Sequence, residues 1–268
     1  MPLSYSVLLL IQISAGAISL LLWSAAFRQL NRHEPLLPRN PDRTAPLPPH
    51  LSLPLFLLCL LLLPELWMNW LKVPHDDHHA NMLYRVLITP PVLLIACGRK
   101  EWLSTLPNAI PPKALPSWQH VRQLLAAGTW GFYLSLLPVF LMFLLVQPFR
   151  TEHRLINLLK EQGDLGTWLE VILSAVVIAP LFEELMFRVL LQGALAQIWK
   201  PASAILFSAF IFGACHGPYD ALPIIPLGIA LGYVYDRTGS YFAAVWTHAL
   251  FNGFNLLMFA LRILSGGS

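Results

Sequence analysis

Three stretches in the second half of the chain place ionisable and amide side chains inside long apolar runs. They read AVVIAPLFEELMFRVLL, FGACHGP and VWTHALFNGFNLL. Polar and charged groups are costly within membrane helices, so they indicate a functional site by default. The side chains concerned are, in chain order, Glu183, Glu184, Arg188, His216, His248 and Asn252.

Helical spacing separates the two adjacent carboxylates of the first stretch. Glu184 and Arg188 are four residues apart, so we expect them to meet on one helical face as an ion pair. Glu183 lies about 100° round the helix from Glu184, outside that pair. Pro180, one turn earlier, is expected to kink the helix or begin a new one. One carboxylate is therefore neutralised by the arginine, and the other is available for chemistry.

The other two stretches supply two imidazoles and an amide. Gly217-Pro218 ends the second stretch, which puts His216 at the C-terminus of a helix. In the third stretch, His248 and Asn252 are four residues apart and share a helical face. Each of these groups alone has a simple explanation, because His and Asn often form hydrogen bonds between membrane helices. Four unrelated packing roles explain the joint pattern poorly.

Two kinds of chemistry suit this set of groups. A carboxylate hydrogen-bonded to an imidazole can take a proton from water, while a second imidazole and an amide donate to an oxyanion. Those groups suffice to hydrolyse a peptide bond. Alternatively, Glu183, His216 and His248 are two His and one Glu, a catalytic zinc set that leaves one position for water. The residues alone favour neither chemistry.

The elements that carry these side chains must be membrane helices. Hydrophobic residues make up 56% of the 268 residues and charged residues 12%, with a mean hydropathy of +0.61. Soluble domains carry about 25% charge, so a soluble globule, a disordered chain and a collagen-like chain are excluded. Lys and Arg exceed Asp and Glu only by 17 to 14, which is too small an excess to indicate nucleic-acid binding. The lipid bilayer is the expected environment.

A membrane-spanning helix needs about 20 mostly apolar residues. Seven or eight stretches qualify, which predicts an all-α, polytopic integral membrane protein of about eight transmembrane helices. Proline-rich segments separate several of them, and proline keeps those loops extended. The predicted spans cover about residues 3–27, 51–70, 82–96, 121–146, 167–191, 202–216, 222–235 and 241–264.

The three motifs together resemble the CPBP family of intramembrane proteases. This family includes the type II CAAX prenyl endopeptidases and the bacterial bacteriocin-processing and self-immunity proteins. The resemblance covers about residues 168–257 and implies a helical core with the active site inside the bilayer. The motifs occur in the family's order, each on its own apolar span: Glu183-Glu184-x-x-x-Arg188, Phe212-x-x-x-His216 and His248-x-x-x-Asn252.

The resemblance also implies a role for each polar group. Glu183 would activate water with the help of His216, and His248 and Asn252 would stabilise an oxyanion. The Glu184–Arg188 pair would support them. Members of this family have been described both as metalloproteases and as metal-independent glutamate proteases. A divalent metal such as zinc and a metal-free mechanism are therefore equal alternatives.

The expected organisation has two parts. Residues 1–150 are predicted to form N-terminal transmembrane helices with proline-rich loops and no assigned function, and residues 151–268 the protease-like catalytic core. The expected partners are a peptide or membrane-protein substrate, prenylated or not, and the lipid bilayer. A bacterial cytoplasmic membrane is the expected location.

Other interpretations compete with the protease. The chain is alternatively a membrane scaffold or immunity protein without catalysis, or a transporter that uses the same groups as a relay. A loop over residues 72–79, with three His and two Asp, is a second candidate metal site, although a solvated loop is its simpler explanation. Cys215 is adjacent to His216, but side chains of neighbouring helical residues diverge by about 100°. We therefore expect Cys215 to be a small core residue.

Overall fold

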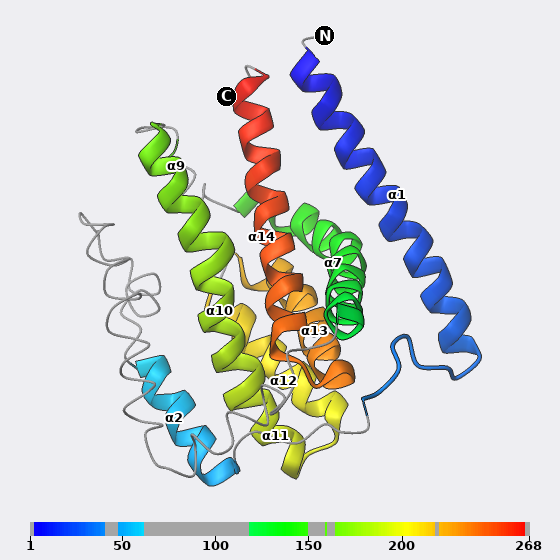
Figure 1. Ribbon diagram of the computed structural model, residues 1–268, viewed down its shortest axis with the longest axis vertical. Helices are drawn as coiled ribbons and strands as arrows, with labels where there is room; N and C mark the ends of the chain where they lie inside the picture. Colours follow the sequence, from blue (N-terminus) through cyan, green and yellow to red (C-terminus); the bar gives the residue numbers. More distant parts are fainter. Residues whose placement is uncertain are drawn as a thin grey trace.

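The computed structural model describes residues 3–40, 48–61, 118–149, 159, 164–217 and 220–265. Within these ranges the regular elements are helices, and no strand occurs among them (Figure 1). The predicted all-α class is confirmed. The predicted span at 82–96 and the His-rich loop at 72–79 lie outside the described residues.

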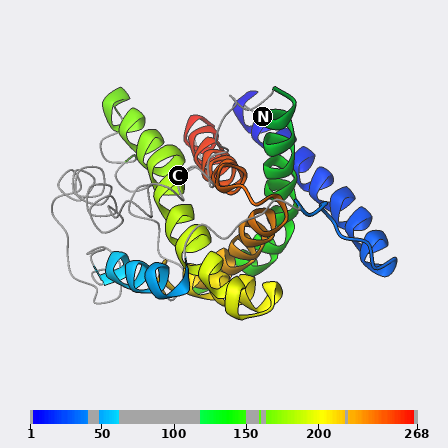
Figure 2. The same ribbon diagram turned by 60° about the horizontal axis from the view of Figure 1, so that its bottom comes forward.

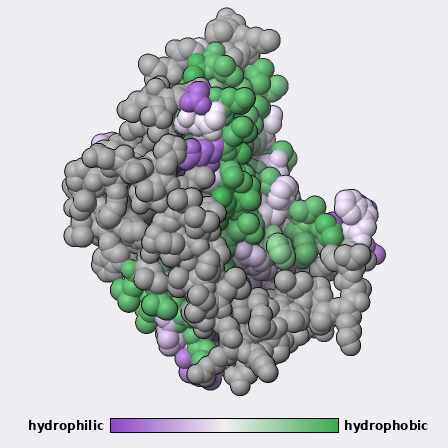
Figure 3. All heavy atoms as spheres, turned by 60° about the vertical axis from the view of Figure 1, so that its left-hand side comes forward, coloured by the Kyte–Doolittle hydropathy of each residue, from purple (hydrophilic) through white to green (hydrophobic). Residues whose placement is uncertain are grey.

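Four helices of the described chain are long and apolar enough to cross a membrane. The face in Figure 3 carries mostly hydrophobic side chains where it is described, as expected for contact with lipid. The integral membrane class is therefore confirmed, but eight spans are not. The four candidate spans lie in α1 (Leu3–Asn31), α7 (Trp118–Val146), the helix Leu165–Ile198 and α14 (Tyr241–Leu264).

Three further helices are shorter than these four within the described residues. They are α2 (Pro49–Leu61), α12 (Pro201–Ala214) and α13 (Ala221–Thr238). At 1.5 Å per residue, the 14 residues of α12 extend about 21 Å, whereas the hydrocarbon core is about 30 Å thick. α12 and α13 pack against each other, and α13 also packs against α7 and α14. α13 is largely buried in the bundle, whereas one face of α12 is exposed, with Leu206, Phe207 and Phe210 on it.

The helix Leu165–Ile198 alternates between α and π geometry. It consists of α9 (Leu165–Ile172), η2 (Leu173–Ile178), α10 (Ala179–Glu184), η3 (Leu185–Gln192) and α11 (Gly193–Ile198), of which η2 and η3 are π-helical. The Asp164 carboxylate caps its start and accepts a hydrogen bond from the Thr167 N–H at 3.0 Å. The helix continues through Pro180, because the π turn before it changes the backbone partners there. Pro180 therefore lies in the first turn of α10, inside a helix that continues from Leu165 to Ile198.

A tight hairpin of α12 and α13 holds His216 at the end of α12. Gly213 lies so close to α13 that a Cβ there would be 2.8 Å from the Ala221 carbonyl oxygen. Gly217 then turns the chain with φ of 92°, a left-handed conformation that favours glycine. His216 itself follows the last turn of α12, as the sequence predicted.

α7 belongs to the N-terminal half but supports α14 of the C-terminal half. Gly128 and Gly131 bring the two helices together: a Cβ at Gly128 would lie 2.7 Å from the Ala243 carbonyl oxygen. The Thr247 hydroxyl donates to the Gly128 carbonyl oxygen at 2.9 Å, next to His248 in the chain. Small residues allow this kind of close packing in membranes. In Figures 1 and 2, α1 and α2 lie on opposite sides of this central group.

Candidate active site

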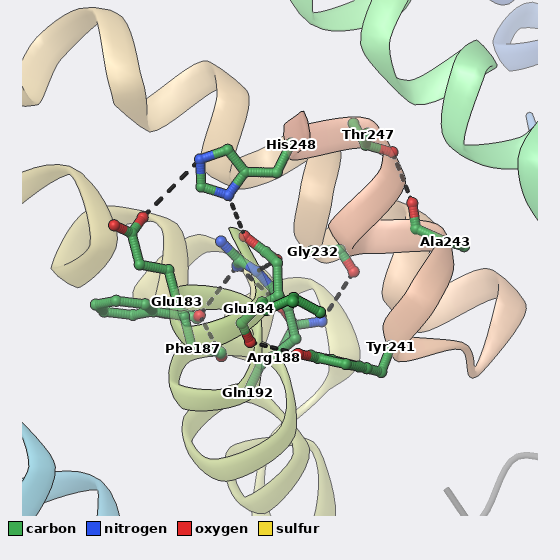
Figure 4. Close-up of polar contacts among 12 residues, drawn as sticks. Glu183, Glu184, Phe187, Arg188, Gln192, Gly232, Tyr241, Ala243, Thr247 and His248 are labelled. Carbon is green, nitrogen blue, oxygen red and sulfur yellow. Dashed lines mark hydrogen bonds and ion pairs between the residues drawn. The ribbon is translucent and has the colours of Figure 1, made fainter. Parts of the chain in front are cut away.

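Glu184 is fully buried, and both of its carboxylate oxygens are hydrogen-bonded. Arg188 Nε donates to Glu184 Oε2 at 2.9 Å, which confirms the predicted ion pair. His248 Nδ1 lies 2.8 Å from Glu184 Oε1 (Figure 4). A carboxylate that is held ionised by an arginine can only accept, so His248 carries a proton on Nδ1. This contact joins α10 to α14 across 64 residues of sequence.

Arg188 extends this link into a buried polar network. Its Nη1 donates to Gln192 Oε1 at 3.3 Å and to Ser208 Oγ at 3.2 Å. Gln192 Nε2 donates in turn to the Gly232 carbonyl oxygen at 2.8 Å. The guanidinium also lies 5.2 Å from the centre of the Phe212 ring. The network therefore ties η3 to both α12 and α13.

Glu183 faces a different environment, one residue away. Its side chain is 22% exposed, and its Oε2 lies 3.8 Å from His216 Nε2 and 3.9 Å from His248 Nε2. Both distances exceed a hydrogen bond. Among the described residues, this buried oxygen has no hydrogen-bond partner. The structure thus brings Glu183, His216 and His248 together around one point.

The two imidazoles are both fixed through Nδ1. His216 Nδ1 lies 2.7 Å from the Phe212 carbonyl oxygen, and a carbonyl can only accept. The Phe212 ring is edge-on to both imidazoles, with centroids 4.8 Å from His216 and 5.7 Å from His248. Each ring therefore presents Nε2 towards the Glu183 carboxylate.

This geometry places three acceptor atoms around one small space. With Nδ1 protonated, a neutral imidazole has only a lone pair on Nε2, and the Glu183 carboxylate has only lone pairs. A water molecule is the simplest group that can donate protons to such a set. The carboxylate is then placed to take a proton from it. The exposed fractions of Glu183 and His216, 22% and 29%, leave an approach from outside the packed core.

Asn252 lies elsewhere in the same helix interface. Its Nδ2 donates to the Ala175 carbonyl oxygen in η2 at 2.8 Å. One amide proton is therefore used in holding α14 to the long helix, and the amide carries a second N–H. Cys215 packs against the hydrophobic core, as expected for a small core residue.

The side chains at the centre are of types that bind zinc, but the distances between their donor atoms are too long for a tetrahedral zinc site. Ligands about 2.1 Å from a tetrahedral zinc lie roughly 3.4 Å apart. Glu183 Oε2 is 3.8 Å and 3.9 Å from the two Nε2 atoms, which is wider. Within the described part of the chain, no group of three or more His, Cys, Asp or Glu side chains is arranged to hold a metal ion.

Sequence reasoning missed three features of this site. The contact between Glu184 and His248 depends on tertiary packing, and no local spacing reveals it. Gln192 does carry a local signal, because it follows Arg188 by four residues and so lies on the same helical face. Ser208 gives no such signal, since it reaches Arg188 from α12.

Comparisons with known proteins place the site within a recognised segment. Residues 165–254 match the family model of the type II CAAX prenyl endopeptidase Rce1-like proteins. The "Putative membrane peptidase YdiL" of Bacillus subtilis is 31% identical over 91 residues, which cover 34% of this chain and 37% of that protein. The "UPF0177 protein YaiF" of Lactococcus lactis is 24% identical over 218 residues, covering 74% of this chain and 90% of that protein. No solved structure matches.

The matched segment includes α9 to α13 and the first half of α14, and hence all the polar groups described above. The match to the Bacillus protein spans only about a third of that protein's length. Residues 165–254 are similar to the Rce1-like family, and the resemblance that the three motifs indicated is confirmed.

Proposed function

We propose that the protein is an intramembrane endopeptidase that hydrolyses peptide bonds of membrane-associated or prenylated, CAAX-type proteins or peptides. One observation carries this proposal: the unpaired Oε2 of Glu183 faces the Nε2 atoms of His216 and His248 at 3.8 Å and 3.9 Å. The Rce1-like segment supports the reaction class. The bacterial relatives support a bacterial cytoplasmic membrane as its location.

In the proposed reaction, Glu183 removes a proton from water, assisted by His216, as the water oxygen attacks the peptide carbonyl carbon. The carbonyl π electrons move to its oxygen and form an oxyanion. His248, which takes a proton from solvent at Nε2 before the attack and so becomes an imidazolium, and the second N–H of Asn252 donate to this oxygen. The proton on Glu183 then passes to the leaving nitrogen. The oxyanion collapses, the C–N bond breaks, and the remaining proton of the new carboxyl group passes to the amine, so that a carboxylate and an ammonium group are released.

The buried network has a supporting role in this scheme. Glu184 holds His248 through Nδ1, so that Nε2 points to the reaction centre, and it stabilises the imidazolium that forms there. Arg188 keeps Glu184 ionised and fixed. The steps above pass through protein groups and water alone. A divalent metal on Glu183, His216 and His248 is the alternative chemistry, and it is decided by the experiment below.

The test is a cleavage assay of the purified protein in detergent or lipid, with a peptide library of prenylated and unmodified C-terminal tails. Glu183→Ala should abolish cleavage and leave a folded protein. The matched control is Glu170→Gln, which removes a carboxylate from the same helix 13 residues earlier and should retain activity. Wild-type cleavage that resists a chelator supports the metal-free steps, whereas loss with chelator and recovery with zinc supports the metal. Full activity in Glu183→Ala would refute the proposed role.

A further inference from the structure

Pro180 leaves one carbonyl of the long helix without a backbone donor. In an α-helix, the Ala175 carbonyl would accept from the Ala179 N–H, and in a π-helix from position 180. Here the Ala179 N–H donates to the Ser174 carbonyl oxygen, and proline has no N–H. Neither position can therefore serve Ala175. An unpaired carbonyl at membrane depth costs several kcal/mol, so a donor from elsewhere is required.

Asn252 of α14 supplies that donor. Its Nδ2 donates to the Ala175 oxygen at 2.8 Å, and the two residues are 77 positions apart in the chain. The contact lies close to the reaction centre on both helices. Pro180 precedes Glu183 by three residues, and Asn252 follows His248 by four. A change at this contact therefore acts on the separation between the Glu183 carboxylate and the His248 ring.

The same arrangement occurs at a second proline, far from the site. Pro138 lies inside α7, so the Leu134 carbonyl, four residues earlier, loses its α-helical donor. Trp23 of α1 donates its Nε1 proton to that carbonyl oxygen at 3.0 Å. In both places a side chain from a neighbouring helix completes the hydrogen bonding that a proline interrupts. The contact between Trp23 and Leu134 is therefore a control that involves no proposed catalytic group.

We propose that Asn252 is a positioning residue, which supplies the hydrogen bond that Pro180 withholds from Ala175 and thereby fixes α14 against the helix that carries Glu183. The effect of Asn252 on catalysis rests on the proposed function, whereas the hydrogen bond between Asn252 and Ala175 is independent of it. This role uses one amide proton and is separate from donation to an oxyanion by the other.

The test is a double-mutant cycle of wild type, Asn252→Ala, Pro180→Ala and the double variant, purified in detergent. In the wild-type background, Asn252→Ala should lower the melting temperature by about 2–4 °C. With a farnesylated, internally quenched CAAX peptide as the probe, it should lower kcat about 10- to 100-fold, with little change in KM. Pro180→Ala restores an N–H at position 180. In that background, Asn252→Ala should lower the melting temperature by less than about a third of its effect in wild type. The loss of kcat should also shrink, by the part that positioning contributes, while the part due to the oxyanion donor remains.

Two further variants separate positioning from general damage. Asn252→Leu keeps the approximate size but has no donor, so it should behave like Asn252→Ala. Trp23→Phe removes the corresponding bond at Pro138 and should lower the melting temperature while kcat stays within about twofold of wild type.

Equal losses of melting temperature for Asn252→Ala in both backgrounds would overturn the proposal, as would an Asn252→Ala protein with an unchanged melting temperature. If wild type cleaves no peptide, the proposed function fails, and the melting-temperature cycle still decides whether Asn252 and Pro180 are coupled.

Discussion

Glu183 and Glu184 are neighbours in the sequence, but they occupy opposite chemical environments. Glu184 is fully buried, and its oxygens contact Arg188 and His248 at 2.9 Å and 2.8 Å. Glu183 is partly exposed, and its Oε2 has no hydrogen-bond partner among the described residues. The rotation of about 100° per helical residue is enough to separate them. One carboxylate holds the structure together, and the other is kept reactive.

The difference shows how stability and chemistry are divided within one turn of helix. A buried charge is tolerated when it is paired and hydrogen-bonded, and removing one partner is then costly. A carboxylate oxygen without a hydrogen-bond partner is typical of active sites, where stability is exchanged for function. His248 belongs to both regions, because Nδ1 contacts Glu184 and Nε2 faces Glu183.

The largest effect is expected where the two regions meet. His248→Ala removes the proposed oxyanion donor and leaves Glu184 Oε1 unpaired. Activity should fall about 10²- to 10³-fold, and the free energy of unfolding should fall by about 1–3 kcal/mol. Peptide cleavage and thermal unfolding of the same preparation measure the two losses. If either stays at the wild-type value, His248 does not connect the two regions.

A change confined to the buried network should act mainly on stability. Arg188→Met keeps the length and apolar stem of the side chain but leaves Glu184 as a buried, uncompensated charge. The free energy of unfolding should fall by about 3–5 kcal/mol, as measured by unfolding in mixed detergent with SDS. The variant Arg188→Met/Glu184→Leu removes both charges and should recover much of the loss. Without such recovery, the pairing of the two charges would not explain the cost.

The smallest effect is expected at the start of the long helix, outside both regions. The Thr167 backbone N–H, which donates to the Asp164 carboxylate, lowers the pKa of that carboxyl from its usual value. The pKa of Asp164 is lower in the folded state than in the unfolded state, where it is about 3.9. The cap therefore stabilises the fold above that pH, and this stabilisation is lost as the pH falls through the folded pKa.

Asp164→Ala should therefore lower the melting temperature by no more than about 3 °C at pH 7. The difference in melting temperature between the variant and wild type should become smaller below about pH 4. Activity at pH 7 should be unchanged. If the difference in melting temperature stays constant down to pH 3, the ionised Asp164 carboxylate does not contribute to the stability of the helix start.

Local sequence patterns predicted much of the helical framework. The expected spans at 3–27 and 121–146 correspond to α1 (Leu3–Asn31) and α7 (Trp118–Val146). The ion pair of Glu184 and Arg188 was also predictable, because it depends only on spacing within one helix. These features follow from hydrophobic runs and helical periodicity, which the sequence displays directly.

Other features depend on packing between distant segments. The contact between His248 and Glu184 forms only when α14 lies against α10. The predicted count of about eight spans is not confirmed, and α12, whose composition resembles that of a spanning helix, is only 14 residues long. Apart from Pro180, the sequence carries no signal for the π turns around α10. The hydrogen bond that Asn252 donates to the Ala175 carbonyl oxygen also depends on the packing of α14.

The most direct test compares Glu183→Gln with Glu184→Gln, two identical substitutions at adjacent positions, in peptide cleavage and thermal unfolding. Glu183→Gln should lose activity about 10³-fold while its melting temperature stays equal to or above that of wild type. Glu184→Gln should lower the melting temperature together with activity. If Glu183→Gln is instead the less stable variant, or cleaves peptides at the wild-type rate, the division between a structural and a reactive carboxylate is contradicted.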